Sequence, residues 1–361
     1  MKKTILHIID NLGRGGAETM LVNAIRELPD YHHIVVTLHS ENEFGDALKC
    51  DKIICLHLGS VINFTWAAIK LRRIIAENKP AVVHSHLFWS TIIARIGTPK
   101  KIPLISTIHT SVAQSAEYRP QWMRLLEKIT YNIRKNIIIA VSKGALDEYF
   151  NLIKVKPYKK YPLYTFVDTK VFNEAVAVPK KQSNIFRLIT VGNLKGVKNH
   201  DFLLNVLKDL QHENISLDIY GKGPLQEELQ KKIDALKINV VLKGQVTNIE
   251  TELKQYDLFV MSSLYEGFSV SVLEAMALGM PLLLTDITSF KEQCEDTALY
   301  FSLNDPATFI EKLQALKRNT EELKRLGLAA KKRVLQHFTL DKHIEKLKLI
   351  YSDAMNDSAY R

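Results

Sequence analysis

The sequence predicts an α/β protein made of two doubly wound domains that face each other across a cleft. The chain has 361 residues, more than one hydrophobic core usually organises. Short, almost continuous apolar runs alternate with amphipathic stretches, and this alternation starts again near the middle of the chain. Strands of this kind, separated by helices, are typical of a parallel sheet covered on both faces.

The first half contains a series of short β-branched runs that we expect to be strands. They lie at residues 5–10, 33–39, 52–58, 81–86, 103–109 and 136–142. Amphipathic patterns between them predict helices at 16–28, 65–78 and 121–135. These elements make up a first domain, which we place at residues 1–170.

The second half repeats the pattern and predicts a second domain at residues 171–339. Its strands are expected at 186–192, 216–221, 239–244, 257–263, 281–286 and 298–301. The weakly periodic stretch 172–184 contains a proline and a polar end, which indicates a linker. Beyond residue 305 the pattern is helical, and periodicity leaves open whether the segment 340–361 packs on the first domain or stays with the second.

Composition and charge narrow the classes of function. No apolar run has the length of a membrane span, and the three cysteines (Cys50, Cys55 and Cys294) lack zinc spacing, so we expect a reducing, cytoplasmic environment. Residues 1–170 contain 24 Lys/Arg against 14 Asp/Glu, whereas residues 171–361 contain 25 of each kind. The basic first half predicts an anionic partner. No zinc-finger or RNP-like motif accompanies the charge, so we expect no nucleic acid, and an anionic membrane surface fits at least as well. The alternative is a basic protein with no such partner.

The stretch EGFSVSVLEAMALGMP, residues 266–281, is the most informative segment. Glu266 follows a predicted strand, and Glu274 lies within a predicted helix that Gly279 ends. Eight helical steps separate the glutamates by roughly 80°, so both can line one groove. We expect the amides of 268–270 to point outward between them at the positive end of the helix dipole. This order of carboxylate, amides and carboxylate suits a sugar, a diphosphate and a ribose. The alternative is helix capping by Glu266 with Glu274 on the surface.

Other candidate residues follow predicted strands. Glycines in NLGRGGAE (11–18) and YGKGP (220–224) allow close backbone approach, although each motif alone is equally explained as a tight turn. Lys198 follows the loop VGNLKG and is a candidate phosphate ligand, or else a solvated surface charge. His109 closes a strand whose end is expected at the cleft, where a histidine binds ligand or hydrogen-bonds a loop.

Taken in order, these segments resemble the retaining glycosyltransferases of the glycogen-synthase-like family, known as family four. The resemblance rests on GGAE at 15–18, AVS at 140–142, FVD at 166–168, GKGP at 221–224, GQV at 244–246, and the Glu-x7-Glu pair at 266 and 274. It implies the GT-B architecture, in which the first Rossmann-like domain faces the acceptor and the second binds the nucleotide-sugar.

The resemblance also implies roles for individual residues. Glu266 is expected near the transferred sugar, Lys198 at the departing diphosphate, and His109 at the donor sugar. Glu274 is expected to bind the ribose. The remaining donor contacts that it implies are Gly15, Gly16, Asn193, Lys195, Gly221, Gly223, Val246, Gly267, Phe268, Ser269 and Val270.

Two departures from the family pattern affect these expectations. Asn193 stands where the family often has arginine, so we expect Lys195 to supply the missing charge. Thr165-Phe166 replaces a usual Asn-Gly, so contacts near residue 165 are not carried over. No Asp-x-Asp signature is present in the sequence, and we therefore expect no metal and no cofactor.

The expected reaction moves a sugar from a nucleotide-diphosphate donor to a saccharide or lipid-linked acceptor in bacterial surface polysaccharide or glycolipid synthesis. Segments 119–136 and 154–161 combine aromatic, apolar and basic residues, which predicts contact with an anionic membrane at the inner face. The alternative for 119–136 is a core helix with a cationic outer face. A nucleotide-sugar epimerase and a non-catalytic nucleotide- or polyanion-binding protein are the rival functions, whereas a dehydrogenase would need a third glycine where Glu18 stands.

Overall fold

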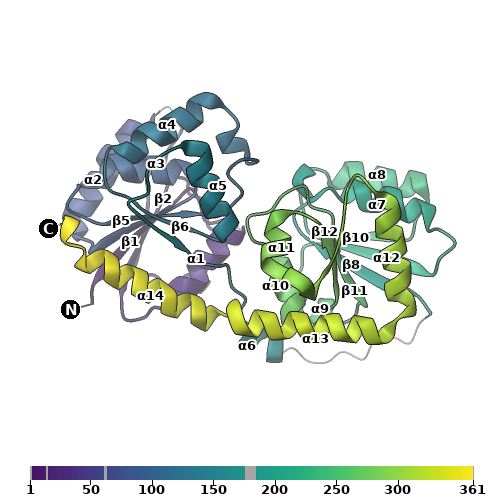
Figure 1. Cartoon of the computed structure of the whole chain (residues 1–361). Coiled ribbons are helices and arrows are strands. Elements are labelled where there is room, and N and C mark those ends of the chain that lie inside the picture. Colours follow the sequence, from purple (N-terminus) through teal and green to yellow (C-terminus); the bar gives the residue numbers. More distant parts are fainter. Residues whose placement is uncertain (1, 14, 61–62, 175–183, 361) are drawn as a thin grey trace. The chain divides into compact units, whose positions relative to one another are not determined.

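The computed structural model describes residues 2–13, 15–60, 63–174 and 184–360. Its chain divides into two compact units: unit 1 comprises Met1–Thr165 with Leu340–Arg361, and unit 2 comprises Phe166–Thr339. Each unit contains one parallel sheet with helices on both faces (Figure 1). The predicted fold class of two Rossmann-like units is thereby confirmed.

Unit 1 contains a seven-stranded parallel sheet in the order β3-β2-β1-β4-β5-β6-β7. The strands are β1 (Thr4–Ile9), β2 (His32–Thr37), β3 (Lys52–Cys55), β4 (Val82–His86), β5 (Leu104–Ile108), β6 (Ile137–Ala140) and β7 (Lys159–Pro162). The helices are α1 (Gly16–Arg26), α2 (Phe64–Asn78), α3 (Phe88–Gly97), α4 (Gln121–Asn132), α5 (Lys143–Ile153) and α14 (Leu340–Asn356). Short 3₁₀ turns lie at Gly45–Ala47, Ala116–Tyr118 and Ser358–Tyr360.

The two faces of this sheet differ in chemistry. One face carries apolar side chains such as Leu6, Ile34 and Val83, which pack with residues of α2 and α3 in a hydrophobic core. The opposite face carries several histidines and is covered by α1 and α14 (Figure 1). Burial of aliphatic side chains therefore stabilises the first face, whereas the second combines an aliphatic cluster around Ile9, Leu21 and Val35 with polar contacts of its histidines.

Strand β7 was not among the predicted strands. Its sequence KKYP pairs in parallel with β6, so that Ile137 lies opposite Lys159 and Ala140 opposite Pro162. The segment is polar because it lies at the edge of the sheet, where alternating apolar residues are not required. Lysine and proline at a sheet edge therefore concealed the strand in the sequence.

Unit 2 contains a six-stranded parallel sheet in the order β10-β9-β8-β11-β12-β13. The strands are β8 (Phe186–Val191), β9 (Ile215–Tyr220), β10 (Val240–Gly244), β11 (Leu258–Met261), β12 (Leu282–Thr285) and β13 (Leu299–Phe301). The helices are α6 (Thr169–Glu174), α7 (His200–Asp209), α8 (Gln226–Leu236), α9 (Ile249–Leu253), α10 (Val270–Ala277), α11 (Thr288–Cys294), α12 (Pro306–Arg318) and α13 (Thr320–His337). Short 3₁₀ turns lie at Gly196–Lys198 and Glu295–Thr297. The predicted linker 172–184 lies mostly outside the described residues, and its first residues belong to α6.

The C-terminal helix α14 packs on unit 1. Lys159 of β7 forms ion pairs with Asp353 at 2.8 Å and with Asp357 at 2.9 Å. The hydroxyl of Tyr351 lies 2.8 Å from Nδ1 of His84 on β4. Periodicity left open on which domain the segment 340–361 packs. These contacts place it on unit 1, where α14 completes the histidine-bearing face of the sheet. Among the described residues no helix combines the length and the apolar character needed to cross a bilayer.

Candidate active site

The turn that carries Lys198 is held against the carboxyl end of β11. The hydroxyl of Ser262 donates to the carbonyl oxygens of Lys198 (3.1 Å) and Asn199 (2.8 Å). The amide of Leu264 donates to the carbonyl oxygen of Val197 at 2.8 Å. Lys198 thus lies in a 3₁₀ turn (Gly196–Lys198) before α7, and Asn199 takes a left-handed φ of 48° to start that helix.

Lys198 and Glu266 form an ion pair in this position. Lys198 Nζ lies 2.6 Å from Glu266 Oε1, and the hydroxyl of Ser263 donates to the same oxygen at 2.8 Å. Only 16% of the lysine side chain and 14% of the glutamate side chain are exposed. A charge-assisted hydrogen bond in such a shielded place is stronger than a surface ion pair. The two residues that the sequence predicted to act on one ligand therefore meet at the same point.

The glycines of unit 2 allow two loops to cross at very short range. A Cβ on Gly221, whose φ is 144°, would lie 2.0 Å from the carbonyl oxygen of Gly192. A Cβ on Gly223 would lie 2.4 Å from the carbonyl oxygen of Leu194. The amide of Leu194 also donates to the carbonyl oxygen of Lys222 at 3.0 Å. The glycines are therefore required for packing of the loop that leads to Lys198, whether or not they also touch a ligand.

Glu274 lies in the middle of α10 and is partly buried. Within the described part of the chain its carboxylate has no hydrogen-bond partner. Burial, with repulsion from Glu250 as a smaller cause, raises the pKa of Glu274 to about 8. A carboxyl group in this state near neutral pH either donates or accepts a hydrogen bond. Glu250 of α9 is a neighbour that the sequence did not single out, because no motif connects the two residues.

The amino-terminal end of α10 differs from the sequence prediction at one position. The backbone amide of Ser269 donates to the side-chain oxygen of Gln293 at 3.0 Å. The side-chain amide of Gln293 donates back to the carbonyl oxygen of Ser269. The prediction that the Ser269 amide points outward for a ligand was therefore wrong. Phe268 is buried, with its ring 5.1 Å from that of Phe338. Gly279 ends the helix region with a left-handed φ of 71°, as the sequence predicted.

The remaining candidates of unit 2 lie in loops after strands. Asn193 and Lys195 are exposed in the turn before α7, where the Lys195 amide donates to the Asn193 carbonyl at 2.8 Å. Val246 is partly exposed after β10, Gly267 is buried, and Val270 is the first residue of α10. No ligand contact is assigned to these residues by their geometry alone.

The candidates of unit 1 form a separate group. His109 directly follows β5, and its Nε2 lies 3.2 Å from Nδ1 of His86. Burial, with nearby His343 as a smaller cause, lowers the pKa of His109 to about 3, so the ring is neutral at ordinary pH. Gly15 caps α1 and Gly16 is its first residue. The Glu18 carboxylate lies over Gly15, where a Cβ would meet Oε2 at 2.4 Å.

Comparison with known proteins agrees with these two units. The family model described as Glycosyltransferase Family 4 matches residues 14–171, and the model described as Glycosyl transferases group 1 matches residues 172–333. Between them the models match both units, and the chain belongs to this family of glycosyltransferases.

Individual relatives and structures are consistent with this assignment. The chain is 24% identical over 322 residues to the Escherichia coli UDP-Gal:alpha-D-GlcNAc-diphosphoundecaprenol alpha-1,3-galactosyltransferase. This alignment covers 81% of each of the two proteins. It is 23% identical over 376 residues to the O-antigen biosynthesis glycosyltransferase WclY of Escherichia coli, covering 98% of this chain and 99% of the relative. The solved structure of Anabaena Alr3699/HepE in complex with UDP and glucose aligns with a TM-score of 0.83 and 16% identity, covering 96% of this chain and 99% of that structure.

Proposed function

We propose that this glycosyltransferase is a retaining, metal-independent enzyme that uses a nucleoside-diphosphate sugar. Its acceptor is a saccharide or a lipid-linked saccharide in bacterial surface polysaccharide or glycolipid synthesis, handled at the inner face of the membrane. The observation that carries the proposal is the shielded Lys198–Glu266 pair at the carboxyl end of a parallel sheet. Ligands of doubly wound sheets bind at this end.

Lys198 is the group that stabilises the departing diphosphate. As the bond between the anomeric carbon and the phosphate oxygen breaks, its electron pair stays with that oxygen and negative charge accumulates there. A positioned ammonium is most effective where charge develops in the transition state. Because Lys198 is already held by Ser262 through its backbone and by Glu266 through Nζ, it needs little reorganisation to meet the phosphate.

Glu266 holds the sugar and faces the positive charge that develops on the ring. The acceptor oxygen forms its bond to the anomeric carbon from the face that the phosphate leaves, and its proton passes to a phosphate oxygen. No protein base is required for this proton. The carboxylate keeps its orientation through Ser263, which donates to Oε1.

Lys198→Ala tests this assignment. Loss of one charge-assisted hydrogen bond should lower kcat by about ten- to a hundredfold. Lys208→Ala removes an exposed lysine from α7 of the same unit and serves as the matched control. Steady-state transfer assays of both variants give the answer, and an unchanged kcat in Lys198→Ala would contradict the role.

Metal independence is tested with a chelator. A thermal-shift panel of nucleoside diphosphates and their sugars, run with and without chelator, should identify one preferred nucleotide and show the same stabilisation in both conditions. Dependence of donor binding or transfer on added Mg²⁺ or Mn²⁺ would contradict the proposal. Incubation of the donor sugar alone distinguishes a transferase from an epimerase, which would convert the donor without an acceptor.

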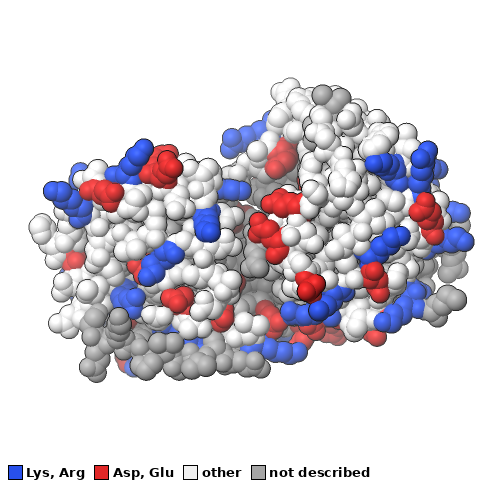
Figure 2. Space-filling view, turned by 180° about the vertical axis from the view of Figure 1, so that it is seen from behind, with Lys and Arg blue, Asp and Glu red and all other residues white. Residues whose placement is uncertain are grey.

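The exposed apolar side chains of helix α4 are the observation that favours membrane contact. Trp122, Leu125 and Ile129 are 57%, 57% and 56% exposed, and Ile133 just after the helix is 42% exposed. This spacing places them along one stripe of the helix. The sequence alternative was a core helix with a cationic outer face, and the outer face of α4 carries exposed apolar side chains beside its cations. Figure 2 shows Lys and Arg mixed with Asp and Glu over the face that it presents, so we rest the argument on α4 and not on net charge.

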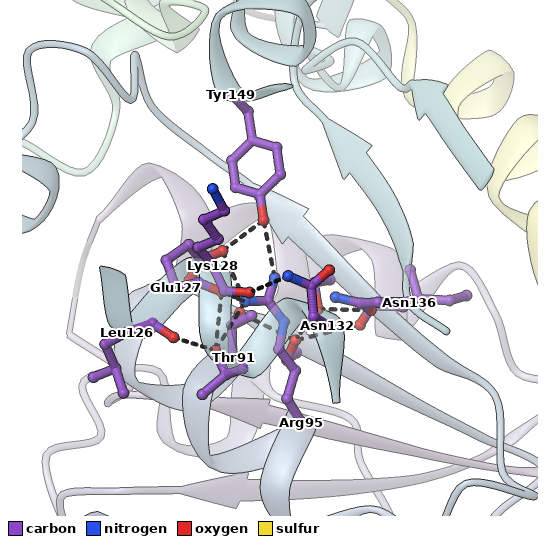
Figure 3. A network of polar contacts seen from close by, with 12 residues as sticks. Thr91, Arg95, Leu126, Glu127, Lys128, Asn132, Asn136 and Tyr149 are labelled. Carbon is purple, nitrogen blue, oxygen red and sulfur yellow. Dashed lines mark hydrogen bonds and ion pairs between the residues drawn. The ribbon is translucent and has the colours of Figure 1, made fainter. Parts of the chain in front are cut away.

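A buried network fixes the rotation of α4. Glu127 points inward and pairs with Arg95 of α3 at 2.8 Å, and the hydroxyl of Tyr149 of α5 donates to the same carboxylate oxygen at 2.6 Å (Figure 3). The side chains of Arg95 and Glu127 are at most 1% exposed. Because an unpaired charge in this position is costly, the inward face of α4 is fixed and its apolar stripe must face outward.

A hollow beside the stripe provides a place for an anionic headgroup. It has a volume of about 490 Å³ and lies between α4 and the end of α5. Its lining includes Arg124, Lys128 and Lys154 together with apolar Leu125. Cations at the edge of an exposed apolar stripe are the arrangement that binds anionic lipid surfaces.

Two parts of the predicted membrane segments are engaged in contacts within the protein and do not form part of the proposed membrane surface. Arg134 is buried and donates to the carbonyl oxygens of Thr98, Pro99 and Ile102. In segment 154–161, Lys159 is paired with α14, and the hydroxyls of Tyr158 and Tyr161 donate to Asp357 and Asp353. The proposed membrane surface is therefore α4 with its hollow, and not the full ranges 119–136 and 154–161.

Liposome flotation tests this surface. Trp122→Ser/Leu125→Ser should lower binding to vesicles that contain anionic lipid, and Arg124→Gln/Lys128→Gln should lower it most at low salt. Leu328→Ser, on an exposed leucine of α13, is the apolar control. Equal flotation with and without anionic lipid would remove the basic hollow from the proposal, and no flotation of the wild type would remove the membrane contact.

A further inference from the structure

One face of the unit 1 sheet carries a line of buried histidines that the proposed reaction does not use. His7 of β1 lies directly opposite His84 of β4 in the sheet register, and His86 follows on the same face. Their rings are packed together, with centroids 5.7 Å apart for His7–His84 and 4.2 Å apart for His84–His86. All three side chains are buried, at 1%, 3% and 5% exposure.

The hydrogen bonds of this line fix which nitrogen of His7 carries a proton. His33 Nε2 lies 2.9 Å from the carbonyl oxygen of Leu28, which only accepts, so this nitrogen is the donor. Neutral His33 therefore accepts at Nδ1 from His7 Nε2, at 3.1 Å. It follows that Nδ1 of His7 holds a bare lone pair, and within the described chain this atom has no partner.

His86 presents a second ring nitrogen of the same kind. Its Nδ1 is 3.2 Å from His109, whereas its buried Nε2 has no partner among the described residues. His84 has a hydroxyl at each nitrogen, Tyr351 at 2.8 Å and Thr107 at 2.7 Å. Rotation of Thr107 about χ1 moves its hydroxyl away from Nε2 and leaves that nitrogen to a cation, while the ring N–H on Nδ1 donates to Tyr351.

The three histidines line one small cavity. A cavity of about 30 Å³ is lined by the three histidines, by His109, His343, Thr107 and Tyr351, and by apolar residues that include members of α1 and α14. One possible ligand nitrogen from each of His7, His84 and His86 lies within 4.8 Å of the others. Tetrahedral zinc with Zn–N bonds of about 2.0–2.1 Å places its nitrogens roughly 3.3 Å apart, which ring rotation can reach from here. An apolar shell around the ligands is usual for such sites.

We propose that His7, His84 and His86 bind a transition metal ion of the Zn²⁺ type, with a solvent molecule as fourth ligand. Neutral imidazoles are the appropriate donors, and the hydrogen bonds of His33 leave such a lone pair on Nδ1 of His7. The ion would tie α14 to the sheet through His84 and Tyr351. It would also fix His86 as a donor to His109 Nε2, leaving the N–H of His109 on Nδ1.

Metal binding is tested on the purified full chain without a polyhistidine tag. After removal of metal with chelator, dialysis against Zn²⁺ should leave about one ion per chain, measured by elemental analysis. Co²⁺ should give the visible absorption bands of a tetrahedral site. His7→Gln and His86→Gln should each weaken binding by at least about tenfold, whereas His39→Gln/His212→Gln, which removes two exposed histidines, should bind like the wild type.

Two results would overturn the proposal. If the wild type retains no zinc above the protein-free control, the cavity holds a water molecule only. If the wild type binds zinc but His7→Gln and His86→Gln retain it equally, the ion is elsewhere. The wild-type titration decides the first case even if both variants fail to fold, and circular dichroism of each variant identifies such a failure.

Discussion

At the scale of single residues, the two glutamates of the 266–281 segment are in opposite electrostatic states. Glu266 is balanced by Lys198, whereas Glu274 has no cationic partner among the described residues and is repelled by Glu250. The Glu-x7-Glu spacing thus unites one carboxylate held in an ion pair and one carboxyl whose pKa is raised to about 8. A ribose hydroxyl that pairs with Glu274 would relieve the cost of its burial.

Glu274→Gln should therefore change the pH dependence of stability. Because the pKa of the folded-state carboxyl is raised, the folded protein holds more protons than the unfolded chain between the ordinary value of 4.5 and about 8, and its stability falls as pH rises through this window. Glutamine removes this loss, so we expect the variant to gain about 1–3 kcal/mol on the wild type between about pH 5 and pH 9. Urea unfolding at several pH values measures the gain, and parallel curves would contradict it.

Glycine positions allow a second test at this scale. Gly221→Ala forces a Cβ against the Gly192 carbonyl at a φ of 144°, and we expect a loss of about 1–3 kcal/mol in the free energy of unfolding. Gly196→Ala is the matched control, because no atom lies within 4 Å of its Cβ position. If both variants unfold at the same urea concentration, the loops move apart more easily than the structure indicates.

Much of the residue-level site could be predicted because its chemistry is local. Lys198 and Glu266 each follow a strand, and the carboxyl ends of parallel strands meet at one edge of a sheet. Ser263, Glu250 and Gln293 were missed, since each acts through a tertiary contact that no sequence spacing encodes. The same reason explains the error at Ser269, whose amide is taken by a side chain 24 residues further along.

At the scale of elements, the contact between α3, α4 and α5 combines apolar packing with a buried ion pair between Arg95 and Glu127. Removing one partner leaves the other charged and unpaired, so Glu127→Ala should destabilise unit 1 by about 3–5 kcal/mol. The double variant Arg95→Met/Glu127→Leu removes both charges and should lose less than the single variant. Urea unfolding of both proteins tests this order, and a double variant less stable than Glu127→Ala would contradict it.

Strands and helices were predicted correctly where the apolar pattern was strong. Prediction failed for a strand whose composition is set by its position at the edge of the sheet. The buried strands of both units were predicted from apolar runs, whereas the edge strand β7 was taken for a surface segment. For α4 the periodicity was recognised, and the helix has apolar residues on two sides: Met123 and Leu126 pack on the core, whereas Trp122, Leu125 and Ile129 are exposed. Periodicity shows that a helix has two faces, and only the position of Glu127 shows which one is buried.

At the scale of the whole molecule, the chain returns to its first unit after completing the second. Unit 1 includes Leu340–Arg361, and α14 contacts its sheet through His84 and its edge strand through Lys159. The sequence left this return open, because an amphipathic helix packs equally well on any apolar surface. The packing of the C-terminal segment on unit 1 is determined by polar contacts between residues almost 200 positions apart, such as Tyr158 with Asp357.

Deleting residues 340–361 should consequently damage unit 1 and spare unit 2. The deletion exposes the buried histidines and leaves Lys159 without Asp353 and Asp357. We expect faster hydrogen exchange in β1, β4 and β7 and a lower melting temperature for unit 1, whereas β8 and β11 keep wild-type exchange. Lys159→Met in the full chain is the graded control, since it removes only the ion pairs and should raise exchange in β7 alone. Unchanged exchange in β1 and β4 after the deletion, or equal loss in both units, would show that α14 does not support the first sheet in this way.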